Sequence, residues 1–266
     1  MYREFYSLSK SPFSKEIKTS EAFSSSTFTE LSLRLDYLKK ARGIGLVTGD
    51  AGAGKTLTLR TFCENLNPSL YKVIYFPLST LAVNDFYRGL CMALGEEPKF
   101  RKVDLFYQIQ KAIVASYKER RITPVFILDE MQMARDTFIL DLSILFNFNM
   151  DSENPFILVL SGLPYLLNKL MLNQHRPLNQ RIVMRYKLEP MNIQEVSCYV
   201  RHNMNIAGAK HEVFSEKALN AIAAVSKGWP RLVNLVAMNC LLYGYQAKKE
   251  EIDEEVVRIA AEESGL

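Results

Sequence analysis

The chain has 266 residues, 48% of them hydrophobic, which suits one large domain or a core domain with a small accessory domain. Its net charge of +4 permits contact with nucleic acid or an acidic membrane surface but does not require it. The four cysteines are far apart, which argues against a disulfide framework or a cysteine-ligated metal, and no segment resembles a signal peptide or a membrane span. We therefore expect a soluble cytoplasmic protein with no membrane contact.

The first 30 residues form a segment rich in serine and aromatic residues, and two interpretations of it remain open. It is either a loosely structured arm or an arm that closes over a binding site in the following domain, with Pro12 and Phe13 among its apolar contacts. Leucines at helical spacing from Leu31 onward then predict a helix over residues 29–40.

Residues 49–56 read GDAGAGKT and fit G-x-x-x-x-G-K-[ST], the phosphate-binding P-loop. The preceding residues 43–48 predict a short buried strand, and apolar residues at helical spacing after the motif predict a helix. Strand, glycine loop and helix are the context that this motif requires. A plain glycine-rich turn with a surface lysine is the alternative, and a second motif further along the chain argues against it.

The chemistry of this loop follows from its residue types. Glycines let the backbone N–H groups approach phosphate oxygens at the positive end of the following helix. Lys55 would reach the β- and γ-phosphates of ATP, and the Thr56 hydroxyl would coordinate Mg²⁺. The nucleotide-binding residues predicted here are Gly49, Asp50, Ala51, Gly52, Ala53, Gly54, Lys55, Thr56 and Leu57.

A second strand and two helices are predicted next, over residues 72–76, 83–94 and 104–118. A polar segment between the helices places three basic residues around Phe100, and such a pattern can hold a nucleic-acid backbone. Three charges in a loop are also ordinary surface, so both interpretations stay open. The candidate DNA-binding residues are Lys99, Arg101 and Lys102.

The second chemical motif is a buried strand, residues 125–128, that ends in Asp129-Glu130. Ligands of open α/β sheets bind at the carboxyl ends of the strands, where these two acids lie. Asp129 would hold Mg²⁺, directly or through water, and Glu130 would orient and polarise the attacking water. Two acids after a strand are weak evidence alone, but together with the P-loop they predict a P-loop ATPase.

Residues 156–160 predict a fourth strand, and Ser161 at its end is a candidate sensor of the γ-phosphate or simply the start of a turn. Residues 186–188 predict the fifth strand. An arginine just before that strand could reach the nucleotide of a neighbouring subunit as an arginine finger, for which Arg181 is the first candidate and Arg185 the second.

After residue 189 the pattern predicts helices only. Asn192 and Glu195 match a capping box, and Ser215 is a predicted helix cap. Pro230 occupies the favoured first position of a helix and is followed by Arg231.

Taken together, the chain resembles AAA+ ATPases of the ExeA/GspA-like group, which includes the transposition regulators TnsC, TniB and MuB. The resemblance spans nearly the whole chain. The segments that carry it are Tyr2 to Phe13, Gly49 to Thr56, Asp129 to Gln132, Ser161 to Pro164, Gln180 to Ile182, and Gly228 to Arg231.

The resemblance implies a parallel five-stranded α/β sheet of order 5-1-4-3-2, flanked by helices, with a small helical lid. The expected domains are an N-terminal arm over the nucleotide site (1–30), the α/β nucleotide-binding domain (31–190) and the lid (191–266).

The resemblance also implies roles for individual residues. Arg231 would be the sensor-2 arginine that contacts the γ-phosphate from the lid, with Pro230 beside it. Arg181 would be the finger donated in trans, and Phe13 with Pro12 would lie near the adenine. Two departures from the group are Met131, where alanine is more frequent, and Ser161-Gly162, where the group often has Gly-Gln. The second departure includes Ser161, the candidate sensor of the γ-phosphate.

The chain ends at Leu266 without the membrane span and cell-wall-binding region of secretion-pathway ExeA proteins. The function expected first is therefore an ATP-dependent DNA-binding regulator of transposition. It would oligomerise on duplex DNA as a ring or filament, without base readout. It would recruit or activate a transposase at the target, with a target-selector protein as a further partner. Hydrolysis would be Mg²⁺-dependent, slow and stimulated by assembly.

Two other functions stay open. One is a GspA-like secretion-pathway ATPase that acts on envelope proteins, which predicts no DNA affinity. The other is a signalling switch that binds ATP and scarcely hydrolyses it.

Overall fold

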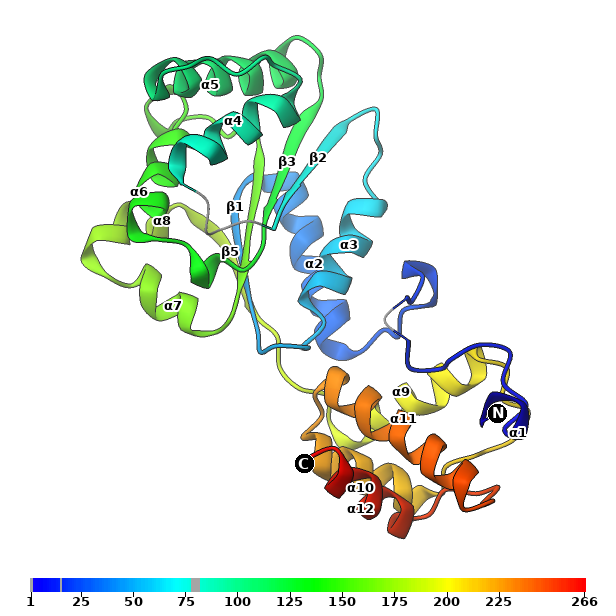
Figure 1. The fold of residues 1–266 in the computed structure, drawn as a ribbon. Helices are drawn as coiled ribbons and strands as arrows, with labels where there is room; N and C mark the ends of the chain where they lie inside the picture. The colour runs from blue at the N-terminus through cyan, green and yellow to red at the C-terminus, as the bar shows by residue number, and fades with distance from the viewer. Residues whose placement is uncertain (1, 15, 78–81) are drawn as a thin grey trace. The chain divides into compact units, whose positions relative to one another are not determined.

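The computed structural model describes residues 2–14, 16–77 and 82–266 (Figure 1). The chain divides into two compact units, each described by itself. The sheet unit consists of Leu31–Asp50 and Thr58–Lys187. The lid unit consists of Leu188–Leu266, Ala51–Leu57 and the described part of Met1–Glu30.

The sheet unit is built on five parallel strands in the order β2-β3-β4-β1-β5, which confirms the predicted order 5-1-4-3-2 read from the other edge. Two of the three interior strands, β1 and β4, are buried at every position, as expected for parallel strands covered on both faces. The strands are β1 (Gly43–Thr48), β2 (Tyr71–Phe76), β3 (Thr123–Leu128), β4 (Ile157–Gly162) and β5 (Ile182–Lys187).

The prediction for the fifth strand was wrong at its start. Strand β5 begins at Ile182, four residues earlier than expected, so Arg185 lies inside the strand. Ile182 and Met184 are buried while Val183 and Arg185 are exposed. This alternation is typical of an edge strand with one face toward solvent. Residues on the solvent face interrupt the apolar run by which a buried strand is predicted, so the start of β5 was missed.

Helices cover the sheet because each has one apolar face. One core cluster joins β-strand residues such as Phe126 and Leu158 to helices α4, α5 and α6. On β1, a Cβ atom at Gly45 would lie 2.6 Å from Leu38 of α2, so glycine here lets that helix approach the strand. The helices are α2 (Ser26–Ala41), α3 (Lys55–Glu64), α4 (Val83–Leu94), α5 (Lys102–Lys118), α6 (Asp136–Leu145), α7 (Tyr165–Leu170) and α8 (Arg176–Gln180), with 3₁₀ turns η2 (Met131–Met133), η3 (Asn149–Asp151) and η4 (Asn173–His175).

The part of the lid unit that follows residue 189 forms helices, as predicted. The Asn192–Glu195 capping box is present at the start of α9, and Ser215 accepts a hydrogen bond from the Ala218 N–H at the start of α10. The elements of the lid unit are α1 (Tyr2–Phe5), η1 (Thr19–Glu21), α9 (Ile193–Ile206), α10 (Glu216–Ser226), α11 (Pro230–Gln246) and α12 (Glu254–Glu263).

The N-terminal arm is ordered in its described residues and belongs to the lid unit. Tyr6, Leu8 and Phe13 are buried in the same core cluster as the lid helices. The Tyr6 hydroxyl donates to the Lys249 carbonyl at 2.9 Å, and the Ser9 N–H donates to the Ala207 carbonyl at 2.7 Å. The loosely structured arm, one of the two interpretations of this segment, does not fit this packing.

Candidate functional site

The glycine loop connects β1 to α3. It begins at the carboxyl edge of the sheet, where the Gly49 N–H donates to the Gly162 carbonyl at 3.2 Å. Gly52 and Gly54 have φ angles of +84° and +99°, which glycine adopts without strain and other residues rarely do. The motif spacing therefore places glycines at the two positions where the turn needs them.

The backbone at the end of this loop faces open space. A Cβ atom built on Gly54 would meet no heavy atom within 4 Å. Lys55 follows as the first residue of α3 and is only 7% exposed, while Thr56 is exposed. Exposed backbone at a helix N-terminus beside a lysine is a suitable environment for phosphate.

Arg231 packs against the same loop within the lid unit. Its N–H donates to the Gly52 carbonyl at 3.4 Å, and a Cβ atom at Gly52 would lie 3.1 Å from the Arg231 Nε. Arg231 is positioned by a tight turn: Gly228 has φ +76°, and a Cβ atom there would lie 2.0 Å from the Met191 carbonyl oxygen. Pro230 then opens α11, so the Gly-Trp-Pro-Arg sequence brings an arginine to the loop.

The acid pair lies at the end of β3 in the sheet unit. The Asp129 N–H donates to the Phe76 carbonyl at 3.1 Å, and the Asp129 side chain is 4% exposed. Its carboxylate accepts hydrogen bonds from the Glu130 N–H at 2.9 Å and from the Tyr75 hydroxyl at 3.4 Å. Burial, and then the charge of Asp129, raise the pKa of the Tyr75 phenol, so this tyrosine stays a hydrogen-bond donor at neutral pH.

Gln132, for which the sequence predicted no role, lies beside the acid pair. Its side-chain amide donates to the Glu130 carboxylate and accepts from the Leu163 N–H at 3.0 Å. The only sequence signal was its place in the Asp-Glu-Met-Gln segment.

Ser161 is fully buried on β4, and its hydroxyl has no hydrogen-bond partner among the described residues. The β3–β4 register pairs Leu128 with Leu160, the residues that directly precede Asp129 and Ser161. An unsatisfied buried hydroxyl is unusual in a folded protein and is compatible with a ligand at this edge.

The two finger candidates differ in their surroundings. Arg181 follows α8, pairs with Asp151 at 2.9 Å and donates to the Ser143 carbonyl. Arg185 lies in β5, donates to the Asn179 carbonyl, and has its pKa lowered by burial. Arg181 directly precedes β5, which is the position predicted for an arginine finger. Here its side chain bonds residues of its own sheet unit.

The candidate DNA-binding residues are exposed. Two of the three, Arg101 and Lys102, pair with acidic side chains, which the sequence did not predict. Arg101 pairs with Asp104 at 2.9 Å, and Lys102 pairs with Asp141 at 2.7 Å. Such surface pairs are weak, but they offset the charge offered to a phosphate backbone.

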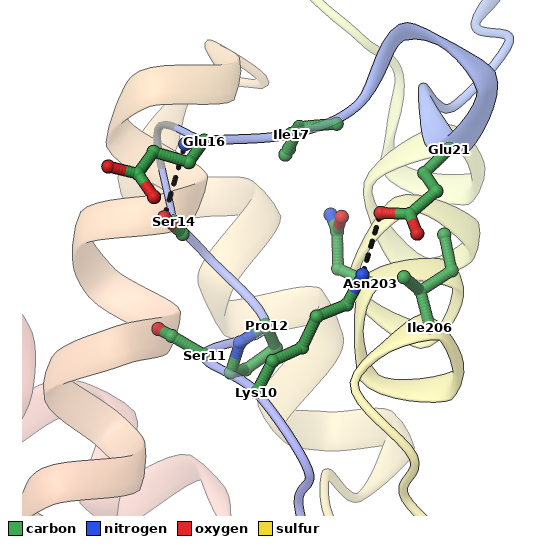
Figure 2. A pocket seen from close by; sticks show the side chains of 9 residues that line it. All are labelled: Lys10, Ser11, Pro12, Ser14, Glu16, Ile17, Glu21, Asn203 and Ile206. Atoms are coloured by element: carbon green, nitrogen blue, oxygen red, sulfur yellow. Dashed lines mark hydrogen bonds and ion pairs between the residues drawn. The ribbon is translucent and has the colours of Figure 1, made fainter.

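A cavity of about 270 Å³ lies between the arm and α9 (Figure 2). Pro12 lines it, and the ion pair between Lys10 and Glu21, 2.6 Å long, crosses one side. Phe13 is not among its lining residues and packs into the lid core instead. No glycine-loop residue lines this cavity, so the expected place of Pro12 and Phe13 near the adenine stays a prediction.

Comparison with known proteins identifies the family. A family model described as an AAA domain matches residues 38–170, which is half of the chain. General secretion pathway protein A from Aeromonas hydrophila is 30% identical over 270 residues, covering 100% of this chain and 49% of that protein. The chain thus spans about half the length of this relative.

Solved structures show the same fold at low identity. Cdc6p from Pyrobaculum aerophilum matches with a TM-score of 0.72 and 18% identity, covering 95% of this chain and 70% of that chain. The Aeropyrum pernix ORC1 protein, solved in complex with DNA, matches with a TM-score of 0.68 and 14% identity, covering 95% and 68%. The Thermotoga maritima RuvB branch migration motor matches with a TM-score of 0.60 and 17% identity, covering 89% and 67%.

Within the described ranges, no helix combines the length and apolar character needed to cross a membrane. The family match, the parallel sheet and the glycine loop agree with the expected nucleotide-binding fold, and the identity to the Aeromonas protein confirms the resemblance to the ExeA/GspA-like group. The chain belongs to the AAA-domain family of AAA+ ATPases.

Proposed function

We propose that this chain binds ATP with Mg²⁺ and hydrolyses it as the ATPase part of a GspA-like secretion-pathway protein. The observation that carries the proposal is the 30% identity to General secretion pathway protein A along the whole chain. It supports the secretion alternative better than the transposition regulator expected first from the sequence. Because the chain covers 49% of that relative, action on envelope proteins is part of the proposal.

The residues present fit a nucleotide. The space at Gly54 and the unpartnered Ser161 hydroxyl support phosphate contacts at the loop and at the end of β4. The backbone of the glycine loop and Lys55 would hold the phosphates, and Thr56 with Asp129 would coordinate Mg²⁺. ATP with its metal supplies the electrophilic phosphorus and the leaving group.

The remaining chemistry falls to three side chains. Glu130 would accept a proton from the attacking water, which is the role of a general base. Arg231, already packed on Gly52, would stabilise negative charge on the phosphates from the lid. Arg181 would do so from a neighbouring subunit.

Assembly with a second copy is supported by the surroundings of Arg181. Ser143 and Asp151, to which Arg181 bonds, are each next in sequence to an exposed apolar residue: Ile144 is 57% exposed and Met150 is 95% exposed. Exposed apolar side chains around a charged group are typical of an interface. We therefore propose slow hydrolysis that rises with protein concentration as subunits meet.

Binding of duplex DNA is the second candidate. Phe100 is 86% exposed with Arg88 at 5.9 Å from its ring centroid, and Lys99 is next to it. The ORC1 neighbour was solved with DNA, but its identity to this chain supports the fold alone. DNA held through phosphates would be released steeply by salt.

One set of measurements tests both candidates. Purified protein is assayed for ATP turnover with and without Mg²⁺, beside Lys55→Ala and Glu130→Gln. Co-sedimentation with plasmid DNA is measured at low and high salt, with and without an ATP analogue. Turnover that both substitutions abolish, with no ATP-dependent DNA binding, is the expected result. Unchanged turnover in Glu130→Gln contradicts the catalytic assignment, and salt-sensitive, ATP-dependent DNA binding favours the second candidate.

A further inference from the structure

Gln132 links Glu130, the second residue of the acid pair, to the turn that follows β4. It lies in η2, two residues after Glu130, and its side chain is 6% exposed. Its Nε2 donates to Oε2 of Glu130, and its Oε1 accepts from the Leu163 N–H at 3.0 Å. The orientation of the amide is determined, because only its oxygen can accept from an N–H group.

The turn after β4 is shaped around this amide. A Cβ atom at Gly162 would lie 2.6 Å from the Gln132 Oε1 and 2.9 Å from Cδ2 of Leu166. The Tyr165 hydroxyl also donates to the Gln132 carbonyl at 3.4 Å. Gly162 therefore supplies the space that the bridge requires, and both the side chain and the backbone of Gln132 contact the turn that begins α7.

The backbone of Glu130 is itself held in an uncommon conformation. Its φ of +56° is in the left-handed region, which costs a non-glycine residue about 1–2 kcal/mol. Hydrogen bonds from the Glu130 N–H to Asp129, and from the Met133 N–H to the Glu130 carbonyl, each 2.9 Å long, maintain it. Strained backbone that several contacts maintain is typical of a functional position.

We propose that Gln132 is the positioning residue for Glu130, coupling its carboxylate to the turn that follows Ser161. A general base must be held within hydrogen-bond reach of the water it deprotonates, and a buried amide anchored on a backbone N–H provides that restraint. A movement of the turn between β4 and α7 would therefore move the Glu130 carboxylate through the Gln132 side chain. This inference rests on the proposed ATPase function.

The first test is Gln132→Leu, which keeps the approximate side-chain volume and removes both hydrogen bonds. We expect kcat for ATP to fall about 10- to 100-fold, part of what a general base contributes, while KM and ATP affinity stay within about twofold. Met133→Leu is the matched control, because Met133 lies in the same turn with 56% of its surface exposed. A merely structural role would lower ATP affinity or stability without this separation of kcat from KM.

A kinetic cycle checks that Gln132 acts through Glu130. Single-turnover hydrolysis at enzyme excess detects the residual rate of Glu130→Gln, and adding Gln132→Leu to that variant is expected to change this rate little further, because residues that act as one unit are not additive. Independent, multiplying losses overturn the proposal. If Gln132→Leu does not fold, Gly162→Ala tests the same bridge by displacing the amide, and kcat unchanged in that variant overturns it. Wild-type protein without ATP turnover instead refutes the proposed function.

Discussion

Arg231 packs so closely on Gly52 that a Cβ atom built at position 52 would lie 2.4 Å from the Cβ of Arg231. Real Cβ atoms do not approach so closely, so residue 52 must be glycine while α11 begins where it does. The contact joins the glycine loop to the arginine that the lid contributes.

This contact predicts unequal effects of two glycine substitutions. Gly52→Ala and Gly54→Ala both force alanine into a positive φ, which costs about 1–2 kcal/mol each. Only Gly52→Ala also collides with Arg231, whereas the Cβ at Gly54 meets nothing within 4 Å. Thermal unfolding should therefore show a larger drop in Tm for Gly52→Ala. Equal drops would mean that Arg231 does not pack on the loop in solution.

Substitution of the lid arginine should separate hydrolysis from binding. Arg231→Ala removes a positive charge from beside the loop but leaves the backbone bond to Gly52 intact. We expect kcat for ATP to fall about 10²-fold or more, a loss typical of removing one group that stabilises transition-state charge, with a smaller change in ATP affinity. Calorimetric titration with ATP and steady-state turnover measure the two quantities. A loss confined to affinity would assign Arg231 to ground-state binding alone.

Mixed subunits test whether Arg181 acts in trans. Arg181→Ala should lower turnover about 10³-fold or more if it is a finger, with ATP binding unchanged. Mixing it with Glu130→Gln, each inactive alone, should restore part of the activity, because some interfaces then combine an intact Glu130 with an intact Arg181. Arg185→Ala is the comparison, and it should retain turnover. No recovery on mixing would place Arg181 in its own subunit's structure, where it already bonds Asp151.

Asp253 predicts a local effect on lid stability. It caps α12 by accepting from the Val256 N–H at 3.0 Å and also bonds Lys249 at 2.8 Å. Asp253→Ala should lower the free energy of unfolding by about 1 kcal/mol, measured by urea denaturation. Asp253→Asn keeps an oxygen that can cap the helix, so it should lower the free energy of unfolding by less. Equal losses in the two variants would contradict the capping role of Asp253.

The same residue predicts a pH dependence. The hydrogen bond from Lys249, followed by the backbone bond from Val256, lowers the pKa of Asp253 below its usual value. Because the folded pKa is the lower one, its stabilisation is complete above the unfolded pKa of about 3.9 and is lost as pH falls through the folded value. The stability difference between wild type and Asp253→Asn should therefore shrink on acidification below that range. A difference that stays constant down to the pH of acid unfolding would contradict this.

The nucleotide-binding fold could be predicted from the amino-acid sequence, because the patterns that indicate this fold are local. The glycine loop needs positive φ at Gly52 and Gly54, and glycine is the residue that supplies it. Buried parallel strands appear as continuous apolar runs, and the caps at Asn192 and Ser215 depend on residues three positions apart. Strand order followed from resemblance to a known group.

Contacts between residues far apart in sequence could be found only in the tertiary structure. No local pattern shows that Asp141 pairs with Lys102, or that Tyr6 and Phe13 bury themselves among the lid helices. The bridge from Gln132 to Leu163 spans 31 residues and exists only because β3 and β4 are neighbours in the sheet. A side chain's partners depend on which strands and helices pack together, and that packing is a property of the whole chain.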